Sequence, residues 1–184
     1  MPTPDTLLVT EKRWYVLRDL KRPNAKQRAW QMLEEKGLEV FTPKKWVLVT
    51  ENGKRRRAEV AFIPDLLFVH DTQSTLDPII AQTETLQYRF RKYGAQNEAL
   101  TVPNADMDRF IRAVGSSVNP QYYTIEEITP EMHNRRIRII GGPLDGQEGH
   151  LLTTRGSKKK RLLVELQGLI AVSVEVTPNF VQMV

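Results

Sequence analysis

The chain has 184 residues, of which 40% are hydrophobic, so it is long enough for one ordinary domain or two small ones with buried cores. Its formal net charge is +5, a basic balance that favours nucleic acid or a nucleoprotein complex as partner. The absence of cysteine excludes disulfides and thiolate metal sites. No apolar run is long enough for a signal peptide or for a membrane helix of roughly 20 residues. We therefore expect a soluble, cytoplasmic protein with no membrane partner.

The first half of the chain alternates between strand-like and helix-like segments. Residues 13–20, RWYVLRDL, are rich in strand formers. A helix is predicted next, with Asn24 as its N-cap and Gly37 at its left-handed end. Its apolar face consists of Ala25, Ala29, Met32 and Leu33. Two strand-like runs, 39–50 and 58–70, flank Asn52-Gly53, a dipeptide that predicts a tight hairpin turn.

A further strand is predicted at 86–94, LQYRFRKYG, and the last helix of this half runs from Asn104 to Gly115. Its apolar residues follow helical spacing at Met107, Phe110, Ile111 and Val114. The order of elements predicts an α+β domain over residues 12–115, with one antiparallel sheet and helices packed on it.

The second half is predicted to be all β. Residues 116–134 contain two prolines and little periodicity, which is typical of a linker. Residues 135–184 contain five short strand-like runs separated by turn residues. Such a segment can bury a core only by curling, so we expect a small β-barrel.

A glycine-rich stretch, IRIIGGPLDGQEGHLL at 137–152, opens this second half. It is not a Walker A loop, because Gly149 is followed by His-Leu-Leu rather than by Lys and Ser or Thr. It is not a dinucleotide fingerprint either, because its glycines are spaced differently and lie between strands. We expect a structural role: a tight turn at Gly142-Pro143, and positive φ or close backbone contact at Gly146 and Gly149.

Several ordered motifs carry a family resemblance over most of the chain. The basic-apolar strand followed by GGPLDGQEG resembles the KOW motif, the start of an SH3-like β-barrel, through Ile139, Gly142, Pro143, Gly146 and Gly149. The first half is similar to the N-terminal (NGN) domain of the NusG family. The matching segments are RWYVL at 13–17, FTPKKWV at 41–47, AFIPDLLFV at 61–69, YRFRKYG at 88–94 and LTVPNADMDRFI at 100–111. The divergent sequence resembles a specialised paralogue of the RfaH or UpxY antiterminator type.

The resemblance implies a transcription elongation or antitermination factor, operon-specific and monomeric, that binds the clamp helices of RNA polymerase and suppresses pausing or termination. The implied contact residues are Trp14, Tyr15, Phe62, Pro64, Leu66 and Phe68. Where the family pattern has Phe-aromatic-Pro-x-Tyr, this chain has Ile63 and Leu66, so the surface stays apolar but lacks a phenolic hydroxyl. An alternative interpretation is that some of these residues fill the core, since neighbours in a strand point opposite ways.

The family's DNA-facing segment corresponds here to Gln82, Thr83, Gln87, Arg89, Arg91 and Lys92. Tyr88, Phe90 and Tyr93 alternate with these basic residues, which suits stacking on the non-template DNA strand or nascent RNA. GKRRR at 53–57 is a second basic candidate, and both segments could instead be solvated surface.

In this family the barrel recruits a ribosomal protein or the termination factor Rho, and the implied face is 139–142 with the strand at 169–176. SKKKR at 157–161 is a further basic segment of the barrel. We expect no enzyme activity, cofactor or metal, because the three histidines are far apart in the sequence and no catalytic motif occurs. The rival hypothesis is a KOW-domain RNA-binding protein that acts in translation or ribosome assembly.

Overall fold

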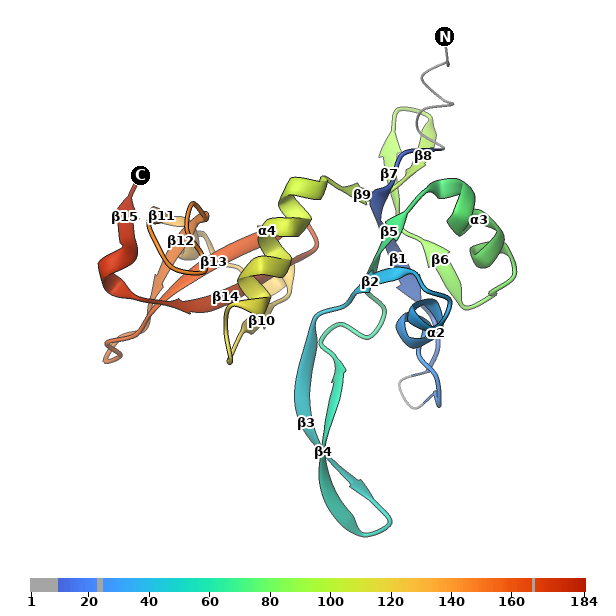
Figure 1. Cartoon of the computed structure of the whole chain (residues 1–184), viewed down its shortest axis with the longest axis horizontal. Coiled ribbons are helices and arrows are strands. Elements are labelled where there is room, and N and C mark those ends of the chain that lie inside the picture. The colour runs from blue at the N-terminus through green and yellow to red at the C-terminus, as the bar shows by residue number, and fades with distance from the viewer. Residues whose placement is uncertain (1–9, 23–24, 167) are drawn as a thin grey trace. The chain divides into compact units, whose positions relative to one another are not determined.

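The computed structural model describes residues 10–22, 25–166 and 168–184 (Figure 1). The chain forms two compact units that divide between Pro103 and Asn104. The predicted N-cap Asn24 lies outside the described residues, and the predicted start of its helix is wrong, because α2 (Ala29–Glu35) has Arg28 as its N-cap and Ala25 precedes it. Among the described residues, no helix has the length and apolar character needed to cross a membrane.

The first unit is built on a five-stranded antiparallel sheet. The order is β2-β5-β1-β6, and β9 also pairs with β1. The strands are β1 (Arg13–Asp19), β2 (Glu39–Phe41), β5 (Leu67–Asp71), β6 (Leu86–Tyr88) and β9 (Thr101–Val102). This sheet bears out the predicted α+β class for the first half, with mixed strands and packed helices.

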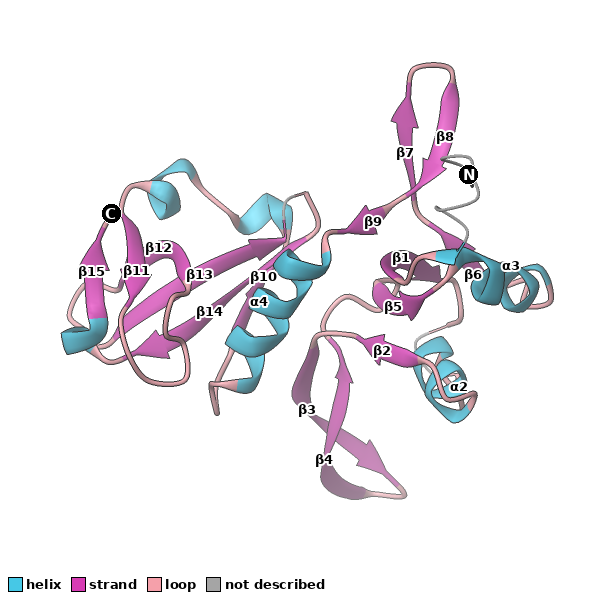
Figure 2. Ribbon diagram, turned by 45° about the horizontal axis from the view of Figure 1, so that its top comes forward, coloured by secondary structure: helices cyan, strands magenta, loops and turns pink. Residues whose placement is uncertain are grey.

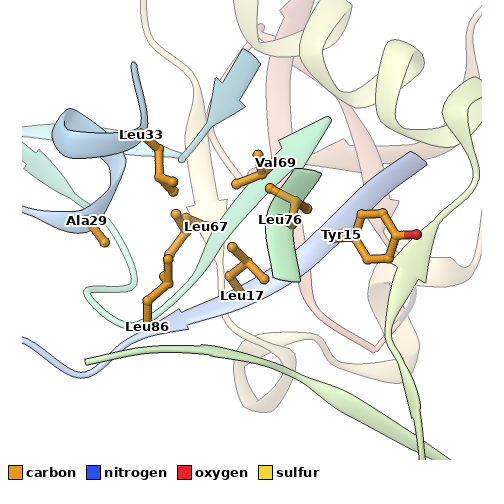
Figure 3. Packing of buried hydrophobic residues seen from close by; sticks show 8 residues of the cluster. All are labelled: Tyr15, Leu17, Ala29, Leu33, Leu67, Val69, Leu76 and Leu86. Carbon is orange, nitrogen blue, oxygen red and sulfur yellow. The ribbon is translucent and has the colours of Figure 1, made fainter. Parts of the chain in front are cut away.

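Two helices, α2 (Ala29–Glu35) and α3 (Gln73–Ala81), pack against one face of this sheet. The shared core consists of Tyr15, Leu17, Ala29, Leu33, Leu67, Val69, Leu76 and Leu86 (Figure 3). The alternate residues of β1, Tyr15 and Leu17, point into it as strand geometry requires. Burial of these apolar side chains is the main stabilising contribution in the unit.

Two hairpins project from the first unit as separate two-stranded sheets (Figure 2). One pairs β3 (Lys44–Glu51) with β4 (Lys54–Ala61), and the other pairs β7 (Phe90–Tyr93) with β8 (Gln96–Ala99). The predicted Asn-Gly turn is confirmed, because Asn52 and Gly53 have φ of 51° and 74°, as a type I′ turn requires.

The two long strand-like runs on either side of that turn are each divided in the structure. Residues 39–50 form β2 and then β3, with Pro43 between them, and residues 58–70 form β4 and then β5, with Pro64 between them. Proline has no N–H to donate to a ladder, so each run leaves the hairpin at its proline and joins the larger sheet. The predicted strand at 86–94 is also divided, at Arg89 rather than at a proline, into β6 and β7.

The second unit contains a six-stranded antiparallel sheet in the order β10-β14-β13-β12-β11-β15. Its strands are β10 (Gln121–Tyr123), β11 (Arg136–Ile139), β12 (Glu148–Thr153), β13 (Lys160–Leu166), β14 (Ile170–Val176) and β15 (Val181–Met183). Three short 3₁₀ helices, η1 (Ile125–Glu127), η2 (Pro130–His133) and η3 (Pro178–Phe180), lie between them. The five predicted strands are all present, and closure into a barrel remains a prediction.

The division of the chain differs from the predicted one at two places. The helix α4 (Asn104–Gly115), which we expected to complete the first domain, belongs to the second unit and packs against β13 and β14. The predicted linker contains β10, which pairs with β14. Helical periodicity predicted part of the apolar face of α4: Met107 and Phe110 are buried, whereas Ile111 and Val114 are only partly buried. Periodicity does not identify which sheet that face meets.

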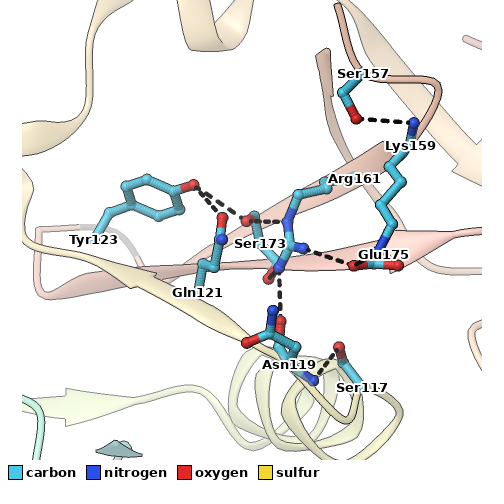
Figure 4. Close-up of polar contacts among 9 residues, drawn as sticks. All are labelled: Ser117, Asn119, Gln121, Tyr123, Ser157, Lys159, Arg161, Ser173 and Glu175. Atoms are coloured by element: carbon cyan, nitrogen blue, oxygen red, sulfur yellow. Dashed lines mark hydrogen bonds and ion pairs between the residues drawn. The ribbon is translucent and has the colours of Figure 1, made fainter. Parts of the chain in front are cut away.

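A buried arginine joins the segment after α4 to the six-stranded sheet (Figure 4). Arg161 on β13 donates from Nε to Ser173 Oγ at 2.8 Å, and from Nη2 to the carbonyl oxygens of Ser173 and Asn119 at 2.7 and 2.8 Å. Glu175 lies 3.5 Å from its Nη1. This part of the predicted linker is therefore tied to the sheet by charge-assisted hydrogen bonds.

The glycine-rich turn follows the two physical roles expected of its glycines. Gly142 and Gly146 have φ of 72° and 76°, which favour residues without a side chain. Gly149 needs space instead, because a Cβ atom there would lie 2.2 Å from the carbonyl oxygen of Leu163. The chain passes so close to β13 at this point that only glycine fits.

We predict that Gly149→Ala lowers the free energy of unfolding by about 1–3 kcal/mol, as overpacking does in tight interiors. Gly115→Ala is the matched control, because it adds the same methyl group where no atom lies within 4 Å. That variant should be neutral or slightly stabilising in a helix. Urea unfolding followed by circular dichroism measures both, and equal stability of the two variants would contradict the close approach.

Candidate protein-docking pocket and nucleic-acid surface

A pocket of about 420 Å³ opens on the first unit between helix α2, the base of the β3–β4 hairpin and the segment after β4. Its apolar lining includes Trp30, Val60, Phe62 and Pro64. We call it the Phe62 pocket. Large apolar side chains presented in a groove of a folded unit are the usual anchors for a protein partner.

Cations lie over both aromatic rings of this region. Lys44 Nζ is 3.9 Å from the ring centroid of Trp30, and Lys45 Nζ is 5.4 Å from that of Phe62. Such cation–π contacts hold the rings in place and put positive charge around an apolar surface. The pocket thus offers apolar contact with a partly basic rim.

A buried ion pair fixes helix α2, which forms one wall of the pocket. Asp19, at the end of β1, lies 3.0 Å from the guanidinium Nη2 of Arg28, and both side chains are largely buried. Asp19 also accepts hydrogen bonds from the backbone N–H groups of Lys21 at 2.9 Å and Ala29 at 3.0 Å. Because Ala29 is the first helical residue, the carboxylate satisfies a helix N–H that has no partner within the helix.

The same arginine fixes the opposite wall. Arg28 Nη2 donates to the carbonyl oxygen of Pro64 at 2.6 Å. The Phe62 N–H donates to the Pro43 carbonyl at 2.7 Å, and the Thr42 hydroxyl donates to the Leu66 carbonyl at 3.1 Å. The segment that carries Phe62 and Pro64 is therefore held at its start, middle and end by hydrogen bonds, so the pocket is preformed.

The structure separates the six expected contact residues into two groups. Phe62 and Pro64 line the pocket and reach solvent. The other four are 3% exposed or less, and they are Trp14, Tyr15, Leu66 and Phe68. The correction has a clear cause: residues 14–17 of β1 and residues 66–69, which lead into its partner strand β5, are buried in succession, so both faces of these two strands are covered.

Sequence reasoning missed Trp30, the large aromatic wall of the pocket. Its helix was correctly expected to bury Ala29 and Leu33. Trp30 lies one position further around the helix than Ala29, at the edge of the buried face, where it is half buried. An aromatic residue directly beside the apolar stripe of a short helix was the signal that could have found it.

The predicted nucleic-acid residues come from three different parts of the first unit. Gln82, Thr83 and Gln87 lie at the end of α3 and on β6, while Arg91 and Lys92 lie on the β7–β8 hairpin. Arg91 and Lys92 are exposed, beside a Phe90 ring that is 58% exposed. The side chain of Tyr93 lies outside the described part of the chain.

Arg89 and Tyr88 have structural roles. Arg89 Nη2 is 3.4 Å from the Asp65 carboxylate, and burial lowers the pKa of its guanidinium. Tyr88 donates its hydroxyl to Asp77 at 2.8 Å, and burial together with this hydrogen bond raises the pKa of Tyr88. Arg89 is thus partly buried and paired with a carboxylate, unlike the exposed Arg91 and Lys92.

The β3–β4 hairpin presents a second basic surface with an aromatic ring. Trp46 and Leu48 alternate on one face of β3 and are 60% and 72% exposed. Arg57 pairs with Leu48 across the strands, and its guanidinium carbon lies 5.3 Å from the Trp46 ring centroid. Arg55 lies on the same face, opposite Thr50. An exposed tryptophan among arginines is the pattern that binds single-stranded nucleic acid by stacking and charge.

Comparison with known families decides the relationship of the chain. A family model described as "Transcription termination factor nusG" matches residues 12–111. The chain belongs to the NusG family. A solved structure described as "Domain interaction in Thermotoga maritima NusG" is 16% identical, with a TM-score of 0.44, over 95% of this chain and 98% of that chain. Comparison with curated protein sequences finds no match.

We predict that Arg28→Met lowers the free energy of unfolding by about 3–5 kcal/mol, because it leaves the Asp19 carboxylate buried without its partner. Arg56→Met is the matched control, since it removes an arginine from an exposed pair with Glu51 at 2.6 Å. Exposed pairs contribute about 1 kcal/mol or less, so this variant should be close to wild type. Chemical unfolding of both variants is the measurement. Similar losses of unfolding free energy would show that the buried Asp19–Arg28 pair contributes no more than an exposed pair.

Proposed function

We propose that this NusG-family transcription factor binds RNA polymerase through the Phe62 pocket and promotes elongation past pause and termination sites. One observation carries the proposal: Phe62 and Pro64, the accessible members of the family's contact motif, line a preformed apolar pocket. The clamp helices of the polymerase, expected as partner from the family, suit such a groove, because apolar anchors on a helix pair can insert between Trp30 and Phe62.

Binding of this kind would act on elongation by shifting populations of the polymerase. A factor that contacts both sides of the nucleic-acid cleft binds the closed clamp better than the open one. The closed state therefore gains stability by the difference between the two affinities, and open, paused states become less populated. Neither a cofactor nor a chemical step is needed.

Recruitment to particular operons would depend on nucleic acid. The exposed residues suited to contact the displaced DNA strand or nascent RNA are Phe90, Arg91 and Lys92 on one hairpin and Trp46, Arg55 and Arg57 on the other. Basic residues neutralise phosphates and rings stack on unpaired bases. These surfaces, with the divergent contact motif, support our proposal of a specialised antiterminator of the RfaH or UpxY type.

We propose a partner surface on the second unit that keeps Ile140 from the expected face, adds Phe180 and leaves out β14. Strand β14 is buried from Ile170 to Val174, so its apolar side chains are occupied within the unit. Ile140 is 52% exposed, and its backbone N–H donates to the carbonyl of Phe180, which is also exposed. A ribosomal protein or Rho would meet this apolar patch rather than β14.

We predict that Phe62→Asp weakens binding to purified RNA polymerase by at least about 30-fold, the effect of losing an anchor worth roughly 2 kcal/mol. Val118→Asp is the control, because it places the same charge at a fully exposed site in the second unit. Biolayer interferometry gives the affinities, and circular dichroism confirms the fold of each variant. If Phe62→Asp binds as tightly as Val118→Asp, the pocket is not the docking site.

If the wild-type protein fails to bind polymerase but binds ribosomal RNA, the translation-linked alternative is favoured.

We predict that Arg55→Glu/Arg57→Glu weakens binding to single-stranded DNA and lowers the salt dependence of the affinity by about two phosphate contacts. Lys36→Glu/Arg155→Glu changes the net charge equally at exposed residues that belong to neither hairpin and is the control. Fluorescence anisotropy at several salt concentrations measures both effects. Equal losses in the two double variants would show that only net charge matters.

A further inference from the structure

Two histidines and a glutamate from separate elements meet in the second unit. His133 lies at the end of η2, His150 on β12 and Glu165 on β13. Each offers one ligand atom, and these atoms all lie within 4.8 Å of one another. His133 and Glu165 are 32 positions apart in the sequence, with His150 between them, which is why their spacing gave no signal of a metal site.

Of the two measured separations between ligand atoms, one is shorter and the other longer than the separation expected around a zinc ion. His133 Nε2 is 2.5 Å from Glu165 Oε1, and His150 Nδ1 is 4.0 Å from the same oxygen. Tetrahedral zinc with bonds of about 2.1 Å to nitrogen and oxygen would separate its ligand atoms by ~3.4 Å. The first of these two distances must widen and the second must shorten, each by less than about 1 Å. The third separation, between the two histidine nitrogens, is no more than 4.8 Å. Side-chain rotation suffices for such changes, because all three side chains are partly exposed.

A cavity of about 510 Å³ opens beside the three ligands, which form part of its lining. It gives an entry path for an ion and room for water at a remaining coordination position. Two cations also line the cavity and would repel a metal ion, but each has a carboxylate partner. Arg136 lies 2.9 Å from Glu148, and Arg109 pairs with Asp106. Glu148 also pairs with Arg138, so Glu165 is the third carboxylate that balances the charge of these three arginines.

We propose that His133, His150 and Glu165 form a binding site for a divalent transition-metal ion of the zinc class. Two imidazoles and one carboxylate are the donor set that suits zinc, with water as the fourth ligand. Calcium and magnesium are disfavoured, since they prefer sites made of oxygen donors.

The bound ion would act as a structural clamp. It would fasten η2 to two neighbouring strands of the sheet, and so fix the segment that precedes β11. A metal ion that binds the folded state but not the unfolded state stabilises the protein. Zinc should therefore raise the melting temperature of the protein, and a chelator should reverse the rise.

Isothermal titration of the full chain without a histidine tag tests the proposal, with ZnCl₂ as the probe. We expect one zinc ion per chain, and affinity at least about tenfold weaker in His133→Ala and in Glu165→Gln. His70→Ala is the control. His70 also pairs with a glutamate, Glu39, at 2.7 Å. However, among the described residues it belongs to no group of three possible metal ligands. Its zinc affinity should equal that of the wild type.

Three outcomes would overturn the site. They are no saturable zinc binding by the wild type, unchanged binding in both His133→Ala and Glu165→Gln, and equal loss in His70→Ala. The first would mean that the three residues form only a hydrogen-bonded cluster. Because His133 is exposed at the end of a 3₁₀ helix, its variant should fold even if a change on a strand does not. The visible absorption of bound Co²⁺, lost in that variant, gives a second readout.

Discussion

The ion pair between Asp19 and Arg28 is the interaction on which the candidate docking site depends. It connects the last residue of β1, the first turn of α2 and the carbonyl of Pro64 within one set of hydrogen bonds. A buried carboxylate is stable only when its charge and its lone pairs are satisfied, and here one guanidinium and two backbone N–H groups do so. The apolar pocket lies between the elements that this pair holds together, so the position of Phe62 follows from electrostatics as much as from hydrophobic packing.

The two kinds of surface on the first unit suit different kinds of partner. The Phe62 pocket is preformed and partly apolar, which favours an ordered protein surface and a slow dissociation rate. The two hairpins carry exposed aromatic rings among cations. Such surfaces favour the binding of single-stranded nucleic acid, with an affinity that depends on salt concentration. Membership of the NusG family makes a transcription complex the natural setting in which protein and single-stranded nucleic acid occur together.

Much of the local structure was predictable because it depends on short-range rules. The Asn52-Gly53 turn, the strands of the second half and the roles of Gly142 and Gly149 follow from backbone sterics alone. Burial was harder to predict. The strand pattern could not show that Trp14, Tyr15, Leu66 and Phe68 are all enclosed, because that depends on what covers each face of the sheet. Contacts between residues far apart in the sequence could not be predicted either, because they also depend on how the elements pack. The partners of Asp19, of α4 and of His133 are examples.

The six-stranded sheet of the second unit ends in two very short strands, β10 and β15. An outermost strand presents backbone donors and acceptors on which another molecule can align, and the risk of uncontrolled self-association grows with its length. Here each border strand offers only three residues, and Pro178 stands close before β15. Each border strand therefore offers few backbone groups on which a strand of another chain could pair.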